Sequence, residues 1–418
     1  MRIFEYRAYG NPEQYAAIDE AIRTTQFVRN KCIRLWMDAK DIPYNVGKSE
    51  ISKHTTELRA DYTWAKKLNA TAVQAAGDRA WDSISRFYKN VREGIKPVGY
   101  PRFRKTVRSV EYKHSGWKLR ILEQGERILP RITFLDGCGI GTLKLKGTWD
   151  TSLHPEELIK RVRLVRKADG YYVQLGVSAC RKEYDEPTGK AIGIDVGLES
   201  FYTDSEGTKI ENPRYLRKSE KQLRRAQRRV SRKFRKGKKQ SANYKKAKKK
   251  LGKKHSKVSR QRKDHAIKAA RCVVMSNDFI AFEDLKVRNM VKNKRLSKSI
   301  NDAGWYQFRV WLEYYGKVYG KITVAVSPEY TSQECSNCGE LVKKTLSTRT
   351  HLCRCGLILD RDHNAALNIL DRALRTVGHT GTWASEAVAA LLARNACGEV
   401  VRSHLGANLA EARRIPRL

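Results

Sequence analysis

The segment Ala191-Ile-Gly-Ile-Asp-Val-Gly197 is an almost continuous apolar run that closes on an acid and a glycine. Such a run is typical of a strand that is buried on both faces, as in the centre of a parallel sheet. Asp195 stands at the carboxyl end of this strand, where open α/β sheets place their sites. A second apolar run, 277–285, carries Glu283 at the corresponding point. We therefore expect an α/β sheet with two carboxylates at one edge.

A third acid follows in Asp360-Arg-Asp362-His-Asn-Ala-Ala, where apolar residues begin to recur at helical spacing. Asp362 should lie in the first turn of that helix. Three converging carboxylates repel one another by about 4 kcal/mol per pair at 4 Å and an effective dielectric constant of 20. A divalent cation removes this repulsion, and carboxylate oxygens suit Mg²⁺ or Mn²⁺. Two such ions about 4 Å apart can activate a water and stabilise the leaving oxygen in phosphodiester hydrolysis.

Each acid also has an ordinary structural explanation. An Asp near a strand end, such as Asp195, is often a turn former, and Glu283 could be a surface acid. Asp362 or Asp360 could cap the N-terminus of the helix. The order of the three acids and the similarity of their settings favour a joint catalytic role over these separate explanations.

The charge of the chain points to a polyanionic partner. The 418 residues include 85 Lys and Arg against 44 Asp and Glu, a formal net charge of +41. Such an excess repels itself in a compact protein, so a neutral metabolic enzyme is excluded and nucleic acid is the first partner to consider. Hydrophobic residues make up 40% of the chain, which excludes a wholly disordered basic protein. No apolar run approaches the roughly 18 to 20 residues of a membrane span, and the N-terminus has no secretion signal. We expect a soluble protein of the cytoplasm, associated with the nucleoid, with no membrane partner.

More than half of the excess charge lies in residues 214–263, which hold 25 basic residues and one acid, Glu220. Helical spacing on either side of the break RKGKKQS predicts an antiparallel helix pair within 213–275. A solvated surface helix would need acidic partners at i,i+4, so a role in contacting phosphates is favoured. The residues expected to bind nucleic acid here are Arg217, Arg224, Arg225, Arg228, Arg229, Arg232 and Lys233.

Four of the nine cysteines form two close pairs, Cys335 with Cys338 and Cys353 with Cys355, and 14 residues separate the pairs. Thiolates at this spacing provide a closed tetrahedral Zn²⁺ site, which is structural because no coordination position stays open. Because the second pair is unusually tight, His351 could replace Cys353 as a ligand. Four reduced thiols without a metal are the alternative. The other five cysteines are scattered, which indicates a reducing compartment.

The sequence pattern of the N-terminal half changes at Gly94. Before it, apolar residues recur at helical spacing over 12–40, 49–62 and 71–91. After it, short strand-like runs begin with VGYPRF at 98–103, and an ADG turn between two alternating runs predicts a hairpin near residue 170. A helical block thus interrupts a β-rich one. Within the β-rich part, Tyr100, Arg102 and Arg104 are candidate contacts for nucleic acid, and a proline-fixed strand start is the alternative.

Taken together, these segments resemble TnpB, the transposon-encoded RNA-guided DNA endonucleases related to type V CRISPR effectors. The resemblance covers residues 1 to about 373. It includes YPRFRK at 100–105 and the basic run 212–233. The other segments that carry it are AIGIDVGLESF (191–201), IAFEDL (280–285), DAGWYQF (302–308), SPEYTSQECSNCG (327–339) and CGLILDRDHNAALNIL (355–370).

The resemblance implies a multi-domain α/β fold with an RNase H-like RuvC nuclease domain, into which the basic helical hairpin and a zinc ribbon are inserted. A wedge β-barrel domain, interrupted by a helical recognition domain, precedes it. The tail matches no family motif and is expected to be disordered, with AVAALLAR as a short helix. The implied divisions are 1–10 and 94–186 (wedge), 11–93 (recognition), 187–190 (linker), 191–329 and 358–375 (RuvC, with the hairpin at 213–275), 330–357 (zinc ribbon) and 376–418 (tail).

The resemblance also implies a function. Asp195, Glu283 and Asp362 correspond to the Mg²⁺-binding RuvC triad, with Asp360 as the less favoured alternative to Asp362. Family members bind a non-coding guide RNA that pairs with one DNA strand, while the protein reads a short target-adjacent motif and one RuvC site cuts both strands. This implies guide RNA and double-stranded DNA as partners, with one protein per RNA.

Two other functions stay open at this stage. A small type V CRISPR effector would use the same chemistry with a CRISPR RNA as its guide. A guide-directed DNA-binding repressor should have lost one of the carboxylates, whereas all three are present.

Overall fold

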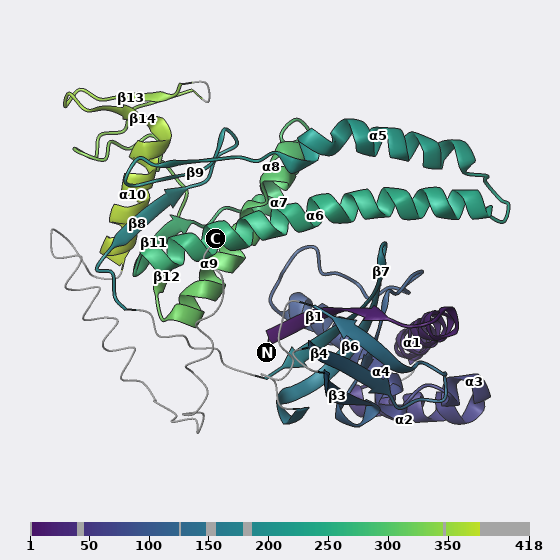
Figure 1. Cartoon of the computed structure of the whole chain (residues 1–418). Helices are drawn as coiled ribbons and strands as arrows, with labels where there is room; N and C mark the ends of the chain where they lie inside the picture. The colour runs from purple at the N-terminus through teal and green to yellow at the C-terminus, as the bar shows by residue number, and fades with distance from the viewer. Residues whose placement is uncertain are drawn as a thin grey trace. The chain divides into compact units, whose positions relative to one another are not determined.

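A computed structural model describes residues 2–39, 46–124, 127–147, 156–178, 186–345 and 348–376. The chain divides into two compact units, Met1–Cys180 and Arg181–Leu418, each with its own sheet and core (Figure 1). The expected mixed α/β class is confirmed. The expected tail helix AVAALLAR lies outside the described residues. Among the helices that the structure describes, none has the length and apolar character of a membrane span.

The N-terminal unit is built on a seven-stranded antiparallel sheet in the order β2-β6-β7-β1-β5-β4-β3. Alternate residues of the first strand, Phe4, Tyr6 and Ala8, enter the core, because successive side chains of a strand point to opposite faces. The sheet is curved, since the rings of Tyr112 on β2 and Phe134 on β4 lie 4.8 Å apart. Its strands are β1 (Arg2–Tyr9), β2 (Ser109–Tyr112), β3 (Trp117–Gln124), β4 (Arg127–Phe134), β5 (Gly141–Lys146), β6 (Ile159–Lys167) and β7 (Gly170–Val177).

Helices between β1 and β2 share one core with this sheet. The first of them begins with a capping box, in which the side chain of Asn11 accepts from the Gln14 amide at 2.8 Å and the side chain of Gln14 accepts from the Asn11 amide at 3.0 Å. The helices are α1 (Pro12–Asp38), α2 (Lys48–Asp61), α3 (Thr63–Lys66) and α4 (Ala70–Arg92), and short 3₁₀ turns lie at His114–Gly116 and Glu156–Leu158.

Residues 98–103 do not form a strand, so the prediction of a strand at VGYPRF is wrong. Pro101 has no amide hydrogen to donate to a ladder. Helix side chains bind the backbone here instead of a neighbouring strand. Asn90 Nδ2 donates to the carbonyl of Val98 at 3.0 Å, and Asn30 exchanges bonds of 3.0 and 2.9 Å with the backbone of Arg104. The segment therefore lies against α1 and α4 rather than in the sheet.

The C-terminal unit has a five-stranded sheet in the order β10-β9-β8-β11-β12. Its three strands β8, β11 and β12 run parallel, and β8, β9 and β10 pair in antiparallel fashion. The register pairs Ile194 with Phe282, so the strand ends that carry Asp195 and Glu283 are neighbours. The strands are β8 (Ala191–Asp195), β9 (Ser200–Asp204), β10 (Lys209–Glu211), β11 (Phe279–Glu283) and β12 (Ile322–Val326).

Two long antiparallel helices, α5 (Tyr215–Lys233) and α6 (Ala242–Ser276), extend from this sheet and pack on each other (Figure 1). The C-terminal part of α6 packs on α9, and its residues Ala266, Ala270 and Val273 enter the core of the unit. The remaining elements are α7 (Val287–Met290), α8 (Ser297–Ala303), α9 (Trp305–Tyr319), β13 (Thr350–Leu352), β14 (Ile358–Asp360) and α10 (Arg361–Thr376).

Helix α10 packs directly on β8 at Gly193. A methyl group at Gly193 would lie 2.1 Å from the carbonyl oxygen of Ala366 and 2.9 Å from the backbone nitrogen of Leu370. Backbone atoms cannot rotate away as a flexible side chain can. Glycine at this position therefore lets the helix lie against the central strand.

Because of this contact, we expect Gly193→Ala to lower the free energy of unfolding by about 3 kcal/mol, the upper end of the range for overpacking. A suitable control is Gly237→Ala, whose added methyl group meets nothing within 4 Å but stands at φ +72°. That strain alone should be worth about 1 kcal/mol. Denaturant unfolding of both variants measures the difference, and equal losses would contradict the close packing at Gly193.

Candidate functional site

Three carboxylates from three elements of the C-terminal unit lie near one another. Asp195 is the last residue of β8, Glu283 the last of β11, and Asp362 stands in the first turn of α10. The Cβ position of Gly197 lies 4.0 Å from Oδ2 of Asp362, which places this acid beside the chain that follows Asp195. Burial, and then the charges of Glu283 and Asp362, raise the pKa of Asp195 well above its usual value. The three like charges therefore act on one another.

Glu283 is held by a hydroxyl group from the loop after β12. Oγ1 of Thr331 donates to Oε1 of Glu283 at 2.6 Å. Burial raises the pKa of Glu283, although this hydrogen bond and the charge of Arg372 act in the opposite direction. Neither Thr331 nor Arg372 was identified from the sequence, because no spacing pattern connects them with an acid on β11.

Asp360 and Asp362 have different surroundings. Asp360 accepts from the amides of Asp362 and His363 at 3.0 and 3.2 Å, so it caps the N-terminus of α10. It also pairs with Lys209 at 2.7 Å. Partial burial acts to raise the pKa of Asp360, but Lys209 and the amides lower it overall. Asp362 instead accepts from the guanidinium of Arg361 at 2.9 and 3.0 Å, and it acts on Asp195 more strongly than Asp360 does.

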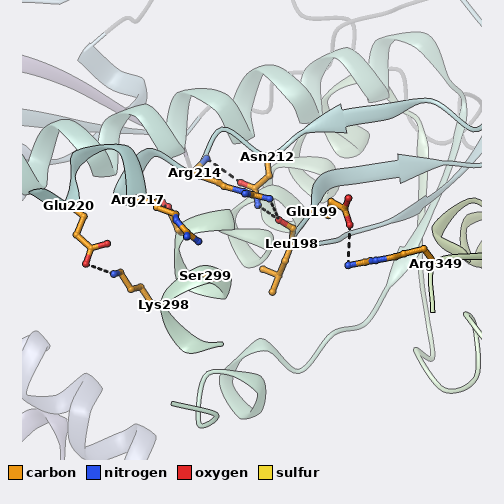
Figure 2. Close-up of a pocket in the computed structure, with 10 residues that line it drawn as sticks. Leu198, Glu199, Asn212, Arg214, Arg217, Glu220, Lys298, Ser299 and Arg349 are labelled. Carbon is orange, nitrogen blue, oxygen red and sulfur yellow. Dashed lines mark hydrogen bonds and ion pairs between the residues drawn. The ribbon is translucent and has the colours of Figure 1, made fainter. Parts of the chain in front are cut away.

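A pocket of ≈ 640 Å³ has Glu199 and Arg349 in its wall (Figure 2). Arg349 connects this pocket with the third acid, since it lies 3.0 Å from Glu199 and 4.0 Å from Asp362. Figure 2 shows Arg349 extended toward Glu199, with Arg214 on the other side of Leu198. The pocket is also lined by Arg217, Glu220, Lys298 and Asp302, so both cations and acids face it.

Asp302 positions the basic end of this pocket. Its carboxylate accepts from the backbone amide of Leu216 at 2.8 and 3.0 Å and from that of Arg217 at 3.2 Å. An acid at this point caps the first turn of α5, where a helix leaves amides unsatisfied. The capping fixes where α5 begins, and with it the cations of its first turn.

The seven basic residues of α5 expected to contact nucleic acid are all exposed. Five of its basic residues and Glu220 line a shallow groove of ≈ 530 Å³. Glu220 is bound by Arg224 at 2.8 Å and by Lys298 at 2.5 Å, so the single acid of the stretch does form one i,i+4 pair. The rest of the positive charge on α5 faces solvent.

The candidate contacts at 100–104 are placed differently from one another. The ring of Tyr100 packs against Trp36 and Phe87, with centroids 5.5 and 5.4 Å apart. The carbonyl of Arg102 accepts from Nη1 of Arg29 at 3.3 Å. Arg104 lines a cavity with other arginines.

The four clustered cysteines come together after β12. Their ligand atoms all lie within 4.8 Å of one another. Sγ of Cys335 is 3.7 Å from that of Cys355, and Sγ of Cys338 is 3.5 Å from that of Cys353. Two thiolates on a tetrahedral zinc with bonds of about 2.3 Å should lie about 3.8 Å apart, so the spacing fits.

The turns that carry the cysteines also fit a metal site. Each turn passes through a glycine in the left-handed region, Gly339 at φ +77° and Gly356 at φ +88°. The amide of Leu357 and the side chain of Asn337 lower the pKa of Cys355 to about 6. Among the described residues, His351 is not part of the thiol group, and its ring contacts Lys344.

Two asparagines fasten the first cysteine turn to α10. Asn364 accepts from the amide of Ser336 at 3.0 Å and donates to the carbonyl of Glu334 at 2.7 Å. Asn368 donates to the carbonyls of Thr331 and Glu334 at 2.8 and 2.7 Å. Because α10 also carries Asp362, the cysteine turn and the third acid are held by one helix.

Comparison with known families matches two parts of the chain. Residues 172–294 match OrfB_IS605, whose description is "Probable transposase". Residues 305–369 match the Cas12f1-like TNB domain. Among solved structures, the Cas12f1 chain of a Cas12f1-sgRNA-target DNA complex is similar with a TM-score of 0.52 and 16% identity, over 86% of this chain and 83% of that one. This likeness concerns the fold.

Curated relatives extend the match to nearly the whole chain. A Streptomyces pristinaespiralis protein assigned as an RNA-guided DNA endonuclease is 30% identical over 416 residues, 96% of this chain and 92% of that protein. InsQ of Escherichia coli K12, assigned in the same way, is 29% identical over 87% of this chain and 84% of its own. The TnpB-like protein L79 of Acanthamoeba polyphaga mimivirus is 32% identical over 142 residues, which make up 32% of this chain and 27% of that protein. The chain therefore belongs to the TnpB family of RNA-guided DNA endonucleases.

Proposed function

We propose that this protein binds a transposon-derived guide RNA, recognises a short target-adjacent motif, and cuts both strands of the paired DNA at Asp195, Glu283 and Asp362. The observation that carries the proposal is the convergence of these three acids at one edge of the sheet, with Asp195 under the charge of the other two. That the guide is an RNA and the substrate is DNA is inferred from the family to which the chain belongs. Such a protein would act on DNA at the nucleoid of a prokaryotic cell, as one protein per RNA.

The acids fit Mg²⁺ or Mn²⁺. They offer hard oxygen ligands, and their like charges are unfavourable together unless a cation lies among them. When bound, such ions supply an activated water and stabilise the leaving oxygen. Asp195 and Glu283 would hold them from the strand ends and Asp362 from the helix, while Thr331 fixes one oxygen of Glu283.

The pocket beside the acids is where we place the DNA strand. Arg214, Arg217 and Lys298 offer cations to successive phosphates, and such contacts position a strand without reading its sequence. Arg349 already bridges Glu199 and Asp362, so it can orient the third acid while it faces the strand. The other exposed cations of α5 are assigned to the guide RNA.

The domain divisions follow from the same proposal. Residues 191–329 and 358–375 form the RuvC domain, with the helix pair α5 and α6 and the ribbon 330–357 as insertions. Residues 1–10 and 94–186 form the wedge domain around the recognition helices at 11–93. The curvature of the N-terminal sheet supports a barrel.

A purified preparation tests the function directly. RNA that copurifies should be sequenced, its guide segment replaced, and a plasmid with the matching target added. We expect linear plasmid in the presence of Mg²⁺ and none with EDTA or a mismatched target. Guided binding without cleavage by the unchanged protein would favour the repressor, and a CRISPR RNA in the preparation would favour the type V effector.

The four thiolates are proposed to hold one structural Zn²⁺. We expect Cys338→Ser to lose the metal and to lower the melting temperature, because zinc binding supplies the folding energy of such a small segment. DNA cleavage should fall as well, since Asn364 and Asn368 connect this segment to the helix of Asp362. The control is Cys272→Ser, an exposed cysteine outside the cluster, which should keep one zinc per chain by elemental analysis. Equal zinc in the two variants would refute the site.

A further inference from the structure

In the N-terminal unit, residues 98–107 form a segment, here called the strap, that is tied to α1 by side chains. Gln26 donates to the carbonyl of Lys105 at 3.1 Å and accepts from the amide of Val107 at 3.3 Å. One turn further along α1, Asn30 makes the corresponding pair of bonds with the backbone of Arg104. The hydrogen bonds of Gln26 and Asn30 thus hold the backbone of the strap in one orientation against α1, which fixes the directions of its side chains.

Four arginines meet in a cavity of ≈ 350 Å³ beside the strap. They are Arg29 from α1, Arg79 and Arg86 from α4, and Arg104 from the strap, and Asp82 is the acid that lines the cavity with them. Arg79 pairs with Glu111 at 3.1 Å. Glu111 also forms ion pairs with Arg163 at 2.5 Å and with Arg161 at 3.7 Å. One carboxylate shared among three arginines neutralises only part of their positive charge.

Arg29 is buried in this cavity, and among the residues that the structure describes no acid pairs with it. Arg29 is only 7% exposed. Its guanidinium donates to two neutral acceptors, Oγ of Ser83 and the carbonyl of Arg102, both at 3.3 Å. Burial, and then the charges of Arg104 and Arg79, lower the pKa of Arg29. A buried cation of this kind is unfavourable unless an anion meets it.

Arg86 and Arg104 leave the cavity open to such an anion. Within the part of the chain that the structure describes, neither forms an ion pair with an acid. Guanidinium groups bind the oxygens of a phosphate through paired hydrogen bonds. The cavity therefore has the charge and the donors of a phosphate site.

The strap residue before Arg104 faces a second cavity. Phe103 lines a space of ≈ 540 Å³ together with Phe27 and cations of α1, and its side chain is 45% exposed. Nζ of Lys31 lies 5.6 Å from the centre of the Phe27 ring. An exposed aromatic ring among cations is an arrangement on which an unpaired base stacks.

We propose that the strap holds one unstacked nucleotide of the guide RNA, with its phosphate among Arg29, Arg86 and Arg104 and its base on Phe103. The proposal rests on the proposed function, which makes a guide RNA the resident ligand. RNA is favoured over target DNA because a phosphate site next to an open aromatic ring fits a splayed single-stranded base, whereas a DNA duplex keeps its bases stacked inside.

The test uses the purified protein with the RNA that copurifies with it. The 2′-hydroxyl reactivity of every nucleotide is compared between free RNA and the complexes of unchanged protein, Arg104→Ala, Arg86→Ala and Phe103→Leu. We expect one nucleotide whose reactivity is changed by the unchanged protein and returns to the free value in all three variants. Each variant should also weaken RNA binding by about tenfold. The control is Arg92→Ala, an exposed residue of α4 outside both cavities, which should behave as the unchanged protein does.

Failure of this inference can be told from failure of the proposed function. A preparation without RNA and without guided cleavage would refute the function before any variant is made. With RNA and cleavage present, an unchanged reactivity pattern in the variants overturns the nucleotide site. If in addition the variant complexes bind target DNA more weakly, the cavities contact DNA and not the guide. Melting temperatures within a few degrees of the unchanged protein show that the variants are folded.

Discussion

Asp195→Asn and Asp362→Asn should each abolish DNA cleavage, whereas Asp360→Asn should leave most of it. Asparagine keeps the volume of the side chain but removes the charge that would hold a metal ion. A bound metal stabilises the transition state by several kcal/mol, so we expect a loss of about 1000-fold or more in rate. An asparagine at 360 can still cap α10 through its amide oxygen. It loses the pair with Lys209, a partly exposed pair worth less than about 1 kcal/mol.

The measurement is the rate of plasmid linearisation at saturating target, with the RNA and zinc content of each variant determined in parallel. Both contents should stay at the level of the unchanged protein, because none of the three acids lies in the cysteine cluster or on α5. If Asp360→Asn is inactive and Asp362→Asn is active, the two acids exchange roles. If both are active, cleavage does not depend on this helix.

Asp278→Ala should lower the free energy of unfolding of the C-terminal unit by about 3 to 5 kcal/mol, the range for breaking one partner of a buried ion pair. Oδ1 of Asp278 lies 2.6 Å from Nζ of Lys321, and the two side chains are 1% and 2% exposed. The second oxygen of Asp278 accepts from the amide of Gly189 at 2.6 Å. These residues stand where β11, β12 and β8 begin, so the pair joins the starts of the three parallel strands. Alanine would remove this carboxylate from the buried ammonium of Lys321.

The effect should depend on pH in a definite direction. Burial acts to raise the pKa of Asp278, but the hydrogen bonds from Lys321 and from the backbone at Thr188 and Gly189 outweigh it and lower the pKa. A carboxyl with a lowered pKa stabilises the folded state above its unfolded pKa of about 3.9 and loses this contribution as the pH falls through the folded value. The gap between the unchanged protein and Asp278→Ala should be constant from pH 7 to 5 and shrink in more acidic solution.

Urea unfolding at several pH values measures this gap. The control is Asp371→Ala, which removes an i,i+4 pair with Arg375 whose side chains are 54% and 69% exposed. Such a pair contributes about 0.3 to 0.5 kcal/mol. Similar losses in both variants would show that the buried pair is worth no more than a surface pair.

The strands and the positions of the three acids were predictable because both depend on local pattern. In the sequence, a buried parallel strand is an apolar run, and the first acid after the run marks the end of the strand. The same reasoning failed at 98–103, because side chains of helices bind the backbone there and just after it: Asn90 of α4 binds Val98, and Asn30 of α1 binds Arg104. Thr331 and Arg349 could not be identified from the sequence for the same reason. The contact of Thr331 with Glu283 and that of Arg349 with Asp362 depend on how loops fold back onto the sheet.

The helix α10 shows how a polar pattern can be read in two ways. Asn364 and Asn368 look like solvent-exposed residues in the sequence, yet both are buried against the first cysteine turn. Their partners are backbone groups, which leave no signature in the sequence. The choice between Asp360 and Asp362 could be framed from the sequence, but the capping bonds and Lys209 were needed to distinguish their surroundings.

The helix pair α5 and α6 leaves the sheet after β10 and returns at β11, which lies directly beside β8. The part of α6 before Val258 is remote from the core residues Ala266, Ala270 and Val273, and it packs on α5 instead. Insertions or deletions at the tip of this pair would therefore lengthen or shorten the basic arm without shifting a carboxylate. Under the proposed function, the length of the arm can follow the length of the RNA while the three carboxylates stay in place. For the engineer, the turn at 235–241 is the place to trim the protein or to attach another domain.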